Sequence, residues 1–154
     1  MKVLGPNEAL FEAFFVKYFE FMKDFDLQFN ADQYGINESN YWDVVLAQGS
    51  LEFETFNFIE RRLKLEIPHA FKQLYVMHNS FENQFDLGGI QIVGNPRGRE
   101  LDALTDYLFD CGFSEEINEL RLIPFGTYQD EWIICFDTVQ NKENPPIVLY
   151  EMSL

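Results

Sequence analysis

The chain has 154 residues, of which 47% are hydrophobic and 24% are charged, and both values are typical of a soluble globular domain. Its 26 acidic residues outnumber 11 basic ones, which gives a formal net charge of −15. Such a surface repels nucleic-acid phosphate and anionic membranes, because proteins that bind either one neutralise it with Lys and Arg. The same charge attracts a basic protein partner, and it also keeps a chain with 17 Phe residues soluble. Both interpretations stay open at this point.

The sequence contains no run of about 18 uncharged apolar residues, so it predicts no membrane-spanning helix. Gly5 and Pro6 interrupt the apolar stretch that a signal peptide needs. The two cysteines, Cys111 and Cys135, stand beside bulky apolar residues, which favours two buried thiols over a disulfide or a reactive site. We therefore expect a cytoplasmic protein.

The first predicted element is a helix from about Asn7 to Phe25. Aromatic and apolar side chains recur there every three or four residues, and we expect this face to be core rather than a docking surface. The stripe consists of Phe11, Phe14, Phe15, Tyr18, Met22 and Phe25. Asn30 to Asn40 is rich in Asn, Asp, Gly and Ser and is predicted to be a loop, followed by a short helix over Tyr41 to Ala47.

The middle of the chain predicts three helices and one strand. Thr55 to Arg62 and Leu101 to Phe109 show helical periodicity, and the second pattern ends before Cys111-Gly112. Pro68 favours a helix start, so His69 to Asn79 forms the next predicted helix. Ile90 to Val93 is predicted to be a strand.

The last third predicts strands. They cover Leu120 to Phe125, Trp132 to Phe136 and Ile147 to Tyr150, separated by turn or loop residues over Gly126 to Asp130 and Thr138 to Pro146. Short consecutive strands of this kind are typical of an antiparallel meander. Helices early and strands late indicate an α+β fold, and we expect a single domain over residues 1–154.

Recognisable catalytic motifs are missing from the sequence. It has no Gly-rich phosphate loop, no nucleophile elbow and no paired-His zinc motif. His69 and His78 are nine residues apart on one predicted helix and point in opposite directions, so they do not share a metal. We therefore predict no metal, no cofactor and no catalysis. Neighbouring acids such as Glu115 and Glu116 leave a hydrolase as an alternative, although most such pairs among 26 acids arise by chance.

A compact basic loop, Asn95-Pro96-Arg97-Gly98-Arg99, stands out in this acidic chain. Two interpretations apply to it. The arginines contact an anion or an acidic partner, or the loop is a turn whose arginines pair with nearby carboxylates.

Two blocks of sequence carry a family resemblance. In the first, Ile59 to Tyr75, a helix ends in the step Ile67-Pro68, and the pair Phe71-Lys72 opens the next helix, which ends near Asn79. The second block is strand, turn, strand, loop and strand: Leu122 to Gly126, Trp132 to Asp137 and Pro145 to Tyr150. In this order and spacing the blocks resemble the SUKH superfamily, which contains bacterial toxin-immunity proteins and fungal cell-wall synthesis regulators.

The resemblance implies a strongly bent, mainly antiparallel sheet flanked by helices. It also implies an immunity protein that binds and neutralises a cognate bacterial toxin, such as a nuclease, whose basic surface suits an acidic partner. The alternative is a general interaction module of the cell-wall regulator type. The Phe-rich first helix leaves both a monomer and a homodimer open.

Candidate partner-binding residues are the acids that fall in predicted loops or at element ends, together with one aromatic residue that would anchor the complex. They are Asp86, Asp110, Glu115, Glu116, Tyr128, Asp130, Glu131 and Glu143.

Overall fold

The computed structural model describes residues 6–29, 31–41, 51–77, 79–80, 84–86 and 89–152. Its helices are α1 (Pro6–Phe29), α2 (Ala31–Tyr34), the 3-10 helix η1 (Phe53–Phe56), α4 (Asn57–Leu63), α5 (His69–Met77), α6 (Asp102–Phe109) and α7 (Ser114–Glu119). Its strands are β1 (Gln84–Asp86), β2 (Ile90–Val93), β3 (Ile123–Tyr128), β4 (Trp132–Phe136) and β5 (Ile147–Glu151). Within these residues no helix is long and apolar enough to cross a membrane.

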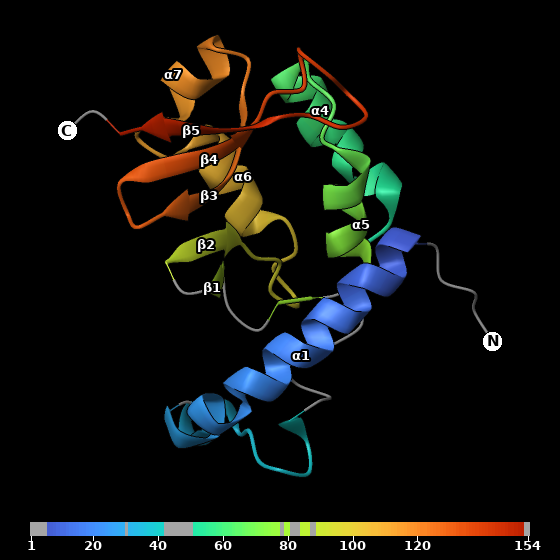
Figure 1. Cartoon of the computed structure of the whole chain (residues 1–154), viewed down its shortest axis with the longest axis vertical. Coiled ribbons are helices and arrows are strands. Elements are labelled where there is room, and N and C mark those ends of the chain that lie inside the picture. The colour runs from blue at the N-terminus through green and yellow to red at the C-terminus, as the bar shows by residue number, and fades with distance from the viewer. Residues whose placement is uncertain are drawn as a thin grey trace.

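The strands form one five-stranded sheet in which every strand pairs antiparallel with the next along the chain. This confirms the predicted meander and extends it by β1 and β2. Helices α6 and α7 contact the sheet, and α5 contacts α1. Figure 1 shows α1 meeting the fold beside α5 and running on past it, away from α7. The α+β prediction is confirmed.

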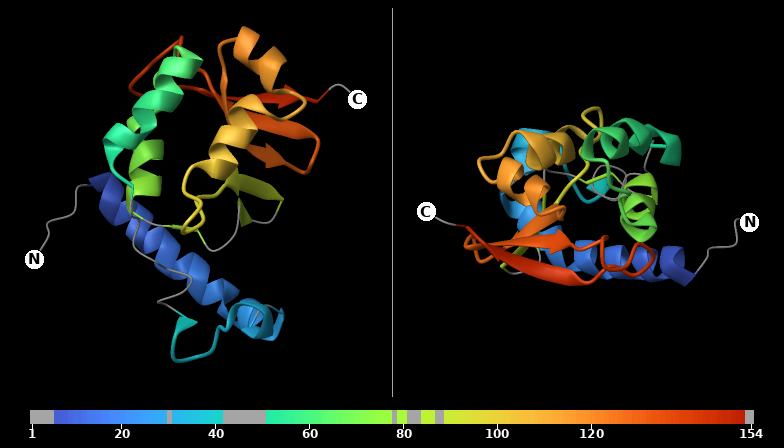
Figure 2. Two further views of the ribbon diagram at one scale, coloured as in Figure 1. Left: turned by 180° about the vertical axis from the view of Figure 1, so that it is seen from behind. Right: turned by 90° about the horizontal axis from the view of Figure 1, so that it is seen from above.

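Alternating residues of β4 pack into two different clusters, because successive side chains of a strand point to opposite faces. Ile134 joins the main core, where Phe71 of α5 contacts the rings of Phe125 and Phe136 at centroid distances of 5.6 and 5.5 Å. Ile133 and Cys135 instead join a smaller cluster with Ile117 of α7. The two clusters therefore lie on opposite faces of β4, although Ile147 and Leu149 of the neighbouring β5 are exposed. The left view of Figure 2 shows α4 and α5 (green) on the other side of the molecule from α7 (orange).

Both predicted ends of β3 were wrong, and one strand of the sheet was not predicted. Strand β3 begins at Ile123 rather than Leu120, because the preceding residues form α7, whose only buried apolar side chain is Ile117. A helix this short offers too few apolar positions for its period to be visible. Gly126 to Tyr128 belong to β3, and the tight turn is confined to Gln129, Asp130 and Glu131. Strand β1 was missed because it has only three residues.

The N-terminal helix is confirmed and runs to Phe29, while the predicted loop after it contains α2. Phe25 was predicted to be core, but 51% of it is exposed and its ring contacts Phe29 at 4.8 Å. This part of α1 extends past the sheet, so the described chain does not cover its apolar face (Figure 1). The side chains of Phe11, Phe14, Phe15 and Tyr18, and most of the predicted helix over Tyr41 to Ala47, lie outside the described residues.

Asn95, in the basic loop singled out in the sequence, is fully buried and joins three segments. Its Oδ1 accepts a hydrogen bond from the backbone N–H of Leu101 at 3.0 Å, and its Nδ2 donates to the carbonyl oxygen of Tyr75 at 3.3 Å. Its own carbonyl oxygen accepts from Asn79 Nδ2 and from the N–H of Ser80, both at 3.0 Å. The end of α5, the end of β2 and the start of α6 thus share one buried polar residue.

Gly126 lies where β2 and β3 approach too closely for a side chain. A Cβ at this position would stand 2.5 Å from the carbonyl oxygen of Gln91 on the neighbouring strand. The register of β3 against β4 also shifts between Pro124 and Gly126, which indicates a bulge. Only glycine fits without displacing the β2 backbone.

We predict that Gly126→Ala lowers the free energy of unfolding by about 1–3 kcal/mol, because the added methyl group forces the two strands apart. Urea unfolding followed by circular dichroism measures this. The matched control is Gly112→Ala, where an added Cβ meets no atom within 4 Å. The control should change stability by less than about 0.5 kcal/mol. Equal effects of the two changes would contradict the close approach of β2 and β3.

We further predict that Asn95→Ala destabilises the fold by at least about 2 kcal/mol, since each buried group that loses its partner costs about 1–3 kcal/mol. The control is Asn141→Ala. Asn141 Oδ1 also accepts two backbone hydrogen bonds, both at 3.0 Å, but in an exposed turn where water replaces it. If Asn95→Ala loses no more stability than Asn141→Ala, the buried hydrogen bonds of Asn95 do not stabilise the fold as described.

Candidate functional site

A cavity of about 350 Å³ opens between α6 and the sheet. We call it the acidic cleft, because the charged side chains among the described residues that line it are two aspartates, Asp106 and Asp130, with no Lys or Arg. Its remaining walls come from β1, β2, β3, Cys111 and Met152. Both aspartates are exposed to solvent, so their charges act outward on an approaching partner.

One of the predicted partner-binding residues lines this cleft, and two others are chain neighbours of lining residues. Asp130 lines it directly. Asp110 directly precedes the lining residue Cys111 in the chain, and its charge helps to raise the pKa of that thiol. Glu131 follows Asp130 in the turn, and its carbonyl oxygen accepts a hydrogen bond from the N–H of Met152 at 3.2 Å. The β3–β4 turn and the end of α6 therefore place acids at the cleft or next to its lining residues in the chain.

The acids of α6 share one side of the helix. Asp102, Asp106 and Asp110 recur every four residues, whereas Leu104 and Leu108 are buried on the core side. Asp106 was not among the predicted site residues, although this four-residue spacing was visible in the sequence. The last turn of α6 contains no basic residue, and acids near a helix C-terminus oppose the helix dipole. Helix stability alone thus gives no reason for acids at this end.

Tyr128 was expected in a loop, but it is the last residue of β3. It pairs with Trp132 across the hairpin and with Ile90 on β2. The side chain is partly buried and packs against the main core. It stands beside the turn that carries Asp130, so an anchoring role would use only its exposed part.

The remaining predicted residues do not join the acidic cleft. Glu115 lines a separate cavity of about 550 Å³ together with Arg62, whose guanidinium lies 3.8 Å above the ring of Phe109. Glu116 shares the first turn of α7 with Glu115, and Glu143 lies in the loop between β4 and β5. Asp86 ends β1, and its side chain lies outside the described residues.

Both cysteines carry free thiols, but only one is fully buried. Burial raises the pKa of Cys135 to about 12. Cys111 was expected to be buried and is only partly so, because it lies at the mouth of the acidic cleft. Its pKa is raised first by burial and then by the charges of Asp106 and Asp110. Cys111 therefore reports on the potential in this cleft.

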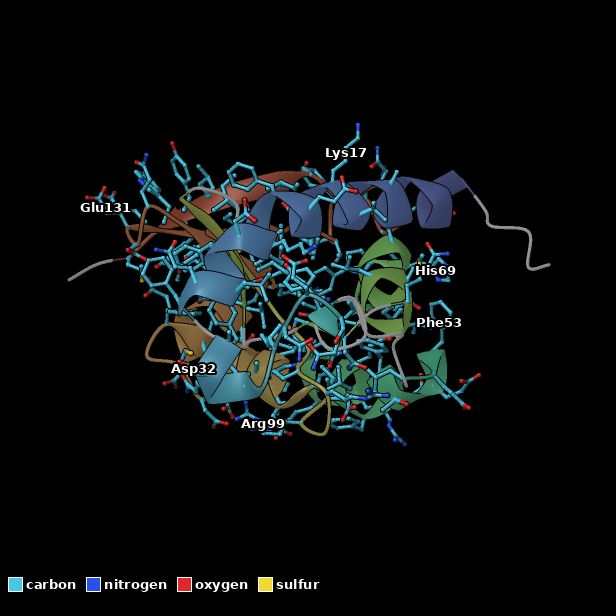
Figure 3. All side chains as sticks on the ribbon, turned by 90° about the horizontal axis from the view of Figure 1, so that it is seen from below. Lys17, Asp32, Phe53, His69, Arg99 and Glu131 are labelled. Atoms are coloured by element: carbon cyan, nitrogen blue, oxygen red, sulfur yellow. The ribbon has the colours of Figure 1, made fainter. Side chains whose placement is uncertain are left out.

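Of the two histidines, only His69 is among the described residues, and it packs against an aromatic ring. The exposed His69 ring stacks on Phe53 with a centroid distance of 4.9 Å and an interplanar angle of 5°, and Figure 3 shows the two side chains next to each other. His78 lies outside the described residues. Asp26 is the one buried acid among the described side chains, and it accepts a hydrogen bond from the Tyr41 hydroxyl at 2.8 Å. No cluster of the described His, Cys, Asp and Glu residues is arranged to hold a metal ion.

We predict that Asp106→Asn and Asp110→Asn each speed the alkylation of Cys111 by iodoacetamide at pH 8. Removing a nearby negative charge lowers the thiol pKa, and the thiolate is the form that reacts. Mass spectrometry of the labelled peptide gives the rate, and Asp102→Asn on the same helix is the control. Cys135 should stay unlabelled until the protein is unfolded. Unchanged rates in both variants would show that these acids exert no potential at the cleft.

The family model described as SMI1 / KNR4 family (SUKH-1) matches residues 51–153, which include everything from η1 to the end of β5. No curated protein matched the chain, and no solved structure matched it. The match covers both blocks on which the resemblance rested, together with α6 and α7 between them. The chain therefore belongs to the SMI1 / KNR4 family (SUKH-1).

Proposed function

We propose that this protein is a cytoplasmic immunity protein that binds a cognate bacterial toxin in a stoichiometric complex and neutralises it. Membership of the SUKH-1 family carries this proposal, because toxin-immunity proteins belong to the SUKH superfamily. Family membership alone does not determine a function, so the binding surface is inferred from the exposed residues of this chain. The protein acts here by binding rather than by catalysis.

The acidic cleft and its rim supply that surface. Asp106 and Asp130 line the cleft from α6 and from the β3–β4 turn, and Asp110 and Glu131 are chain neighbours of lining residues. All four side chains are exposed. Carboxylates arranged in this way steer a basic partner and raise its association rate. A nuclease suits them, since a substrate channel for nucleic acid carries Lys and Arg. The exposed part of Tyr128 beside the turn would add an aromatic contact.

The test is affinity capture of the tagged protein from its native lysate at low and at high salt, with partners identified by mass spectrometry. We expect a protein with a basic toxin domain that is retained at low salt and weakened at high salt. The purified partner should lose its toxic activity when an equimolar amount of this chain is added. A partner that keeps full activity in that complex would contradict neutralisation.

A charge-matched pair of variants tests the surface. The first combines Asp106→Asn, Asp110→Asn, Asp130→Asn and Glu131→Gln, and we expect it to lower the association rate about tenfold or more at low salt. The control removes the same number of exposed acids from α1, α2 and η1, through Glu20→Gln, Asp24→Asn, Asp32→Asn and Glu54→Gln. Equal losses in the two variants would show that net charge, and not the cleft, attracts the partner.

A further inference from the structure

A second cavity, of about 610 Å³, shares no lining residue with the acidic cleft and has the opposite character. The charged residues that line it are Glu60, Arg61, Lys64, Glu66, Arg121 and Lys142. Four of them are cations, in a chain that has only 11 Lys and Arg and a net charge of −15. We call this cavity the basic cleft.

Separate parts of the chain bring these cations together. Arg61 belongs to α4, and Lys64 is the residue that ends this helix. Arg121 follows the end of α7, and Lys142 lies in the loop between β4 and β5. All four side chains are exposed. Among the described residues, Arg61, Lys64 and Arg121 form no ion pair with a carboxylate.

Two of these cations stand where the backbone favours glycine. Lys64 has φ of 57° and Arg121 has φ of 58°, both in the left-handed region just beyond a helix end. A left-handed residue commonly closes a helix, and after α7 the N–H of Leu122 donates to the carbonyl oxygen of Ile117 at 3.2 Å in this way. A Cβ costs free energy in this conformation, so both positions favour glycine over a long side chain. A cation near a helix C-terminus also interacts well with the helix dipole, but α4 already has Arg61 and Arg62 in its last turn. The helix dipole therefore does not by itself explain a further cation at position 64.

The carboxylates of the cleft do not cancel its cations. Glu60 accepts a hydrogen bond from Lys72 at 2.8 Å in a mostly buried ion pair, so the fold already compensates its charge. Glu66 lies 3.7 Å from Lys142, and both side chains are largely exposed, at 66% and 73%. Water and salt screen such a pair strongly. The cleft is left with an excess of positive charge.

From this arrangement we propose that the basic cleft binds a small molecule with two linked phosphate groups. Two guanidinium groups match phosphate oxygens in a forked geometry, and two ammonium groups act as point charges beside them. The volume falls within the range of small-molecule sites, and cations on several walls suit more than one phosphate. Leu65 and the exposed Val139 add apolar surface, so the same diphosphate chemistry fits inorganic pyrophosphate or a nucleoside diphosphate.

Isothermal titration with inorganic pyrophosphate and, separately, with ADP at constant ionic strength tests the site. We expect saturable binding to the wild-type chain. Lys64→Gly and Arg121→Gly should each weaken it about tenfold, since each removes one charge-assisted contact. Both variants should fold at least as well as the wild type, because glycine relieves the left-handed strain. Glu66→Gln should strengthen binding, because it removes a carboxylate from the cleft.

Two controls separate the site from its backbone and from bulk charge. Gln129→Gly makes the same backbone change at φ of 51° outside the cleft, and Arg97→Gln removes an exposed cation elsewhere. Neither should change binding by more than about twofold. Tighter binding of ADP than of pyrophosphate would assign the ligand as a nucleotide, and the reverse would assign inorganic pyrophosphate.

The proposal is overturned if neither probe binds at millimolar concentration, or if both controls weaken binding as much as the cleft variants do. Should Lys64→Gly or Arg121→Gly fail to fold, amide NMR spectra of the wild-type chain decide the question. Pyrophosphate must then shift the resonances of Arg61, Lys64, Arg121 and Lys142, and unshifted resonances would refute the site. Neutralising the acidic cleft should leave pyrophosphate binding intact, so the two proposals fail independently.

Discussion

The hydrogen bonds of buried Asn95 set the positions of α5, β2 and α6 relative to one another. The side chain connects the carbonyl oxygen of Tyr75 at the end of α5 to the N–H of Leu101 before α6. The Tyr75 hydroxyl also donates to the carbonyl oxygen of Val93 in β2. Because buried polar groups are costly to leave without partners, these bonds favour one relative placement of α5, β2 and α6. The packing of Phe71 against the sheet and the position of Asp106 both depend on that placement.

The fold separates opposite charges onto different clefts. Asp106 and Asp130 meet between α6 and the sheet, whereas Arg61 and Arg121 meet where α4 faces the end of α7 and the β4–β5 loop. A surface of this kind presents potentials of opposite sign in two separate clefts. The net charge of −15 reflects the excess of acids over the whole chain and does not reveal the basic cleft. An acidic protein can therefore carry an anion site without contradiction.

The candidate site was only partly predictable from sequence. Asp110, Asp130 and Glu131 were chosen as acids at element ends; Asp130 lines the acidic cleft, and the other two are chain neighbours of its lining residues. Asp106 was missed, since a residue within a helix gave no loop signal, although its spacing from Asp102 and Asp110 placed all three on one side. Tyr128 was assigned to a turn because Gly126 resembled a turn glycine. That glycine serves the close approach of β2 and β3, a distance between strands that local sequence does not contain.

By itself the sequence determined the α+β class, the antiparallel meander, the positions of α1, α4, α5 and α6, and the family. These features follow from local signals: periodicity, Pro at helix starts, and motif order along the chain. Only the tertiary structure decided that Asn95 is buried rather than part of a charged loop, and which acids and which cations share a cleft. The physical reason is that long-range contacts place residues such as Arg61 and Arg121 together. The sequence between them contains no periodicity or motif that predicts this contact.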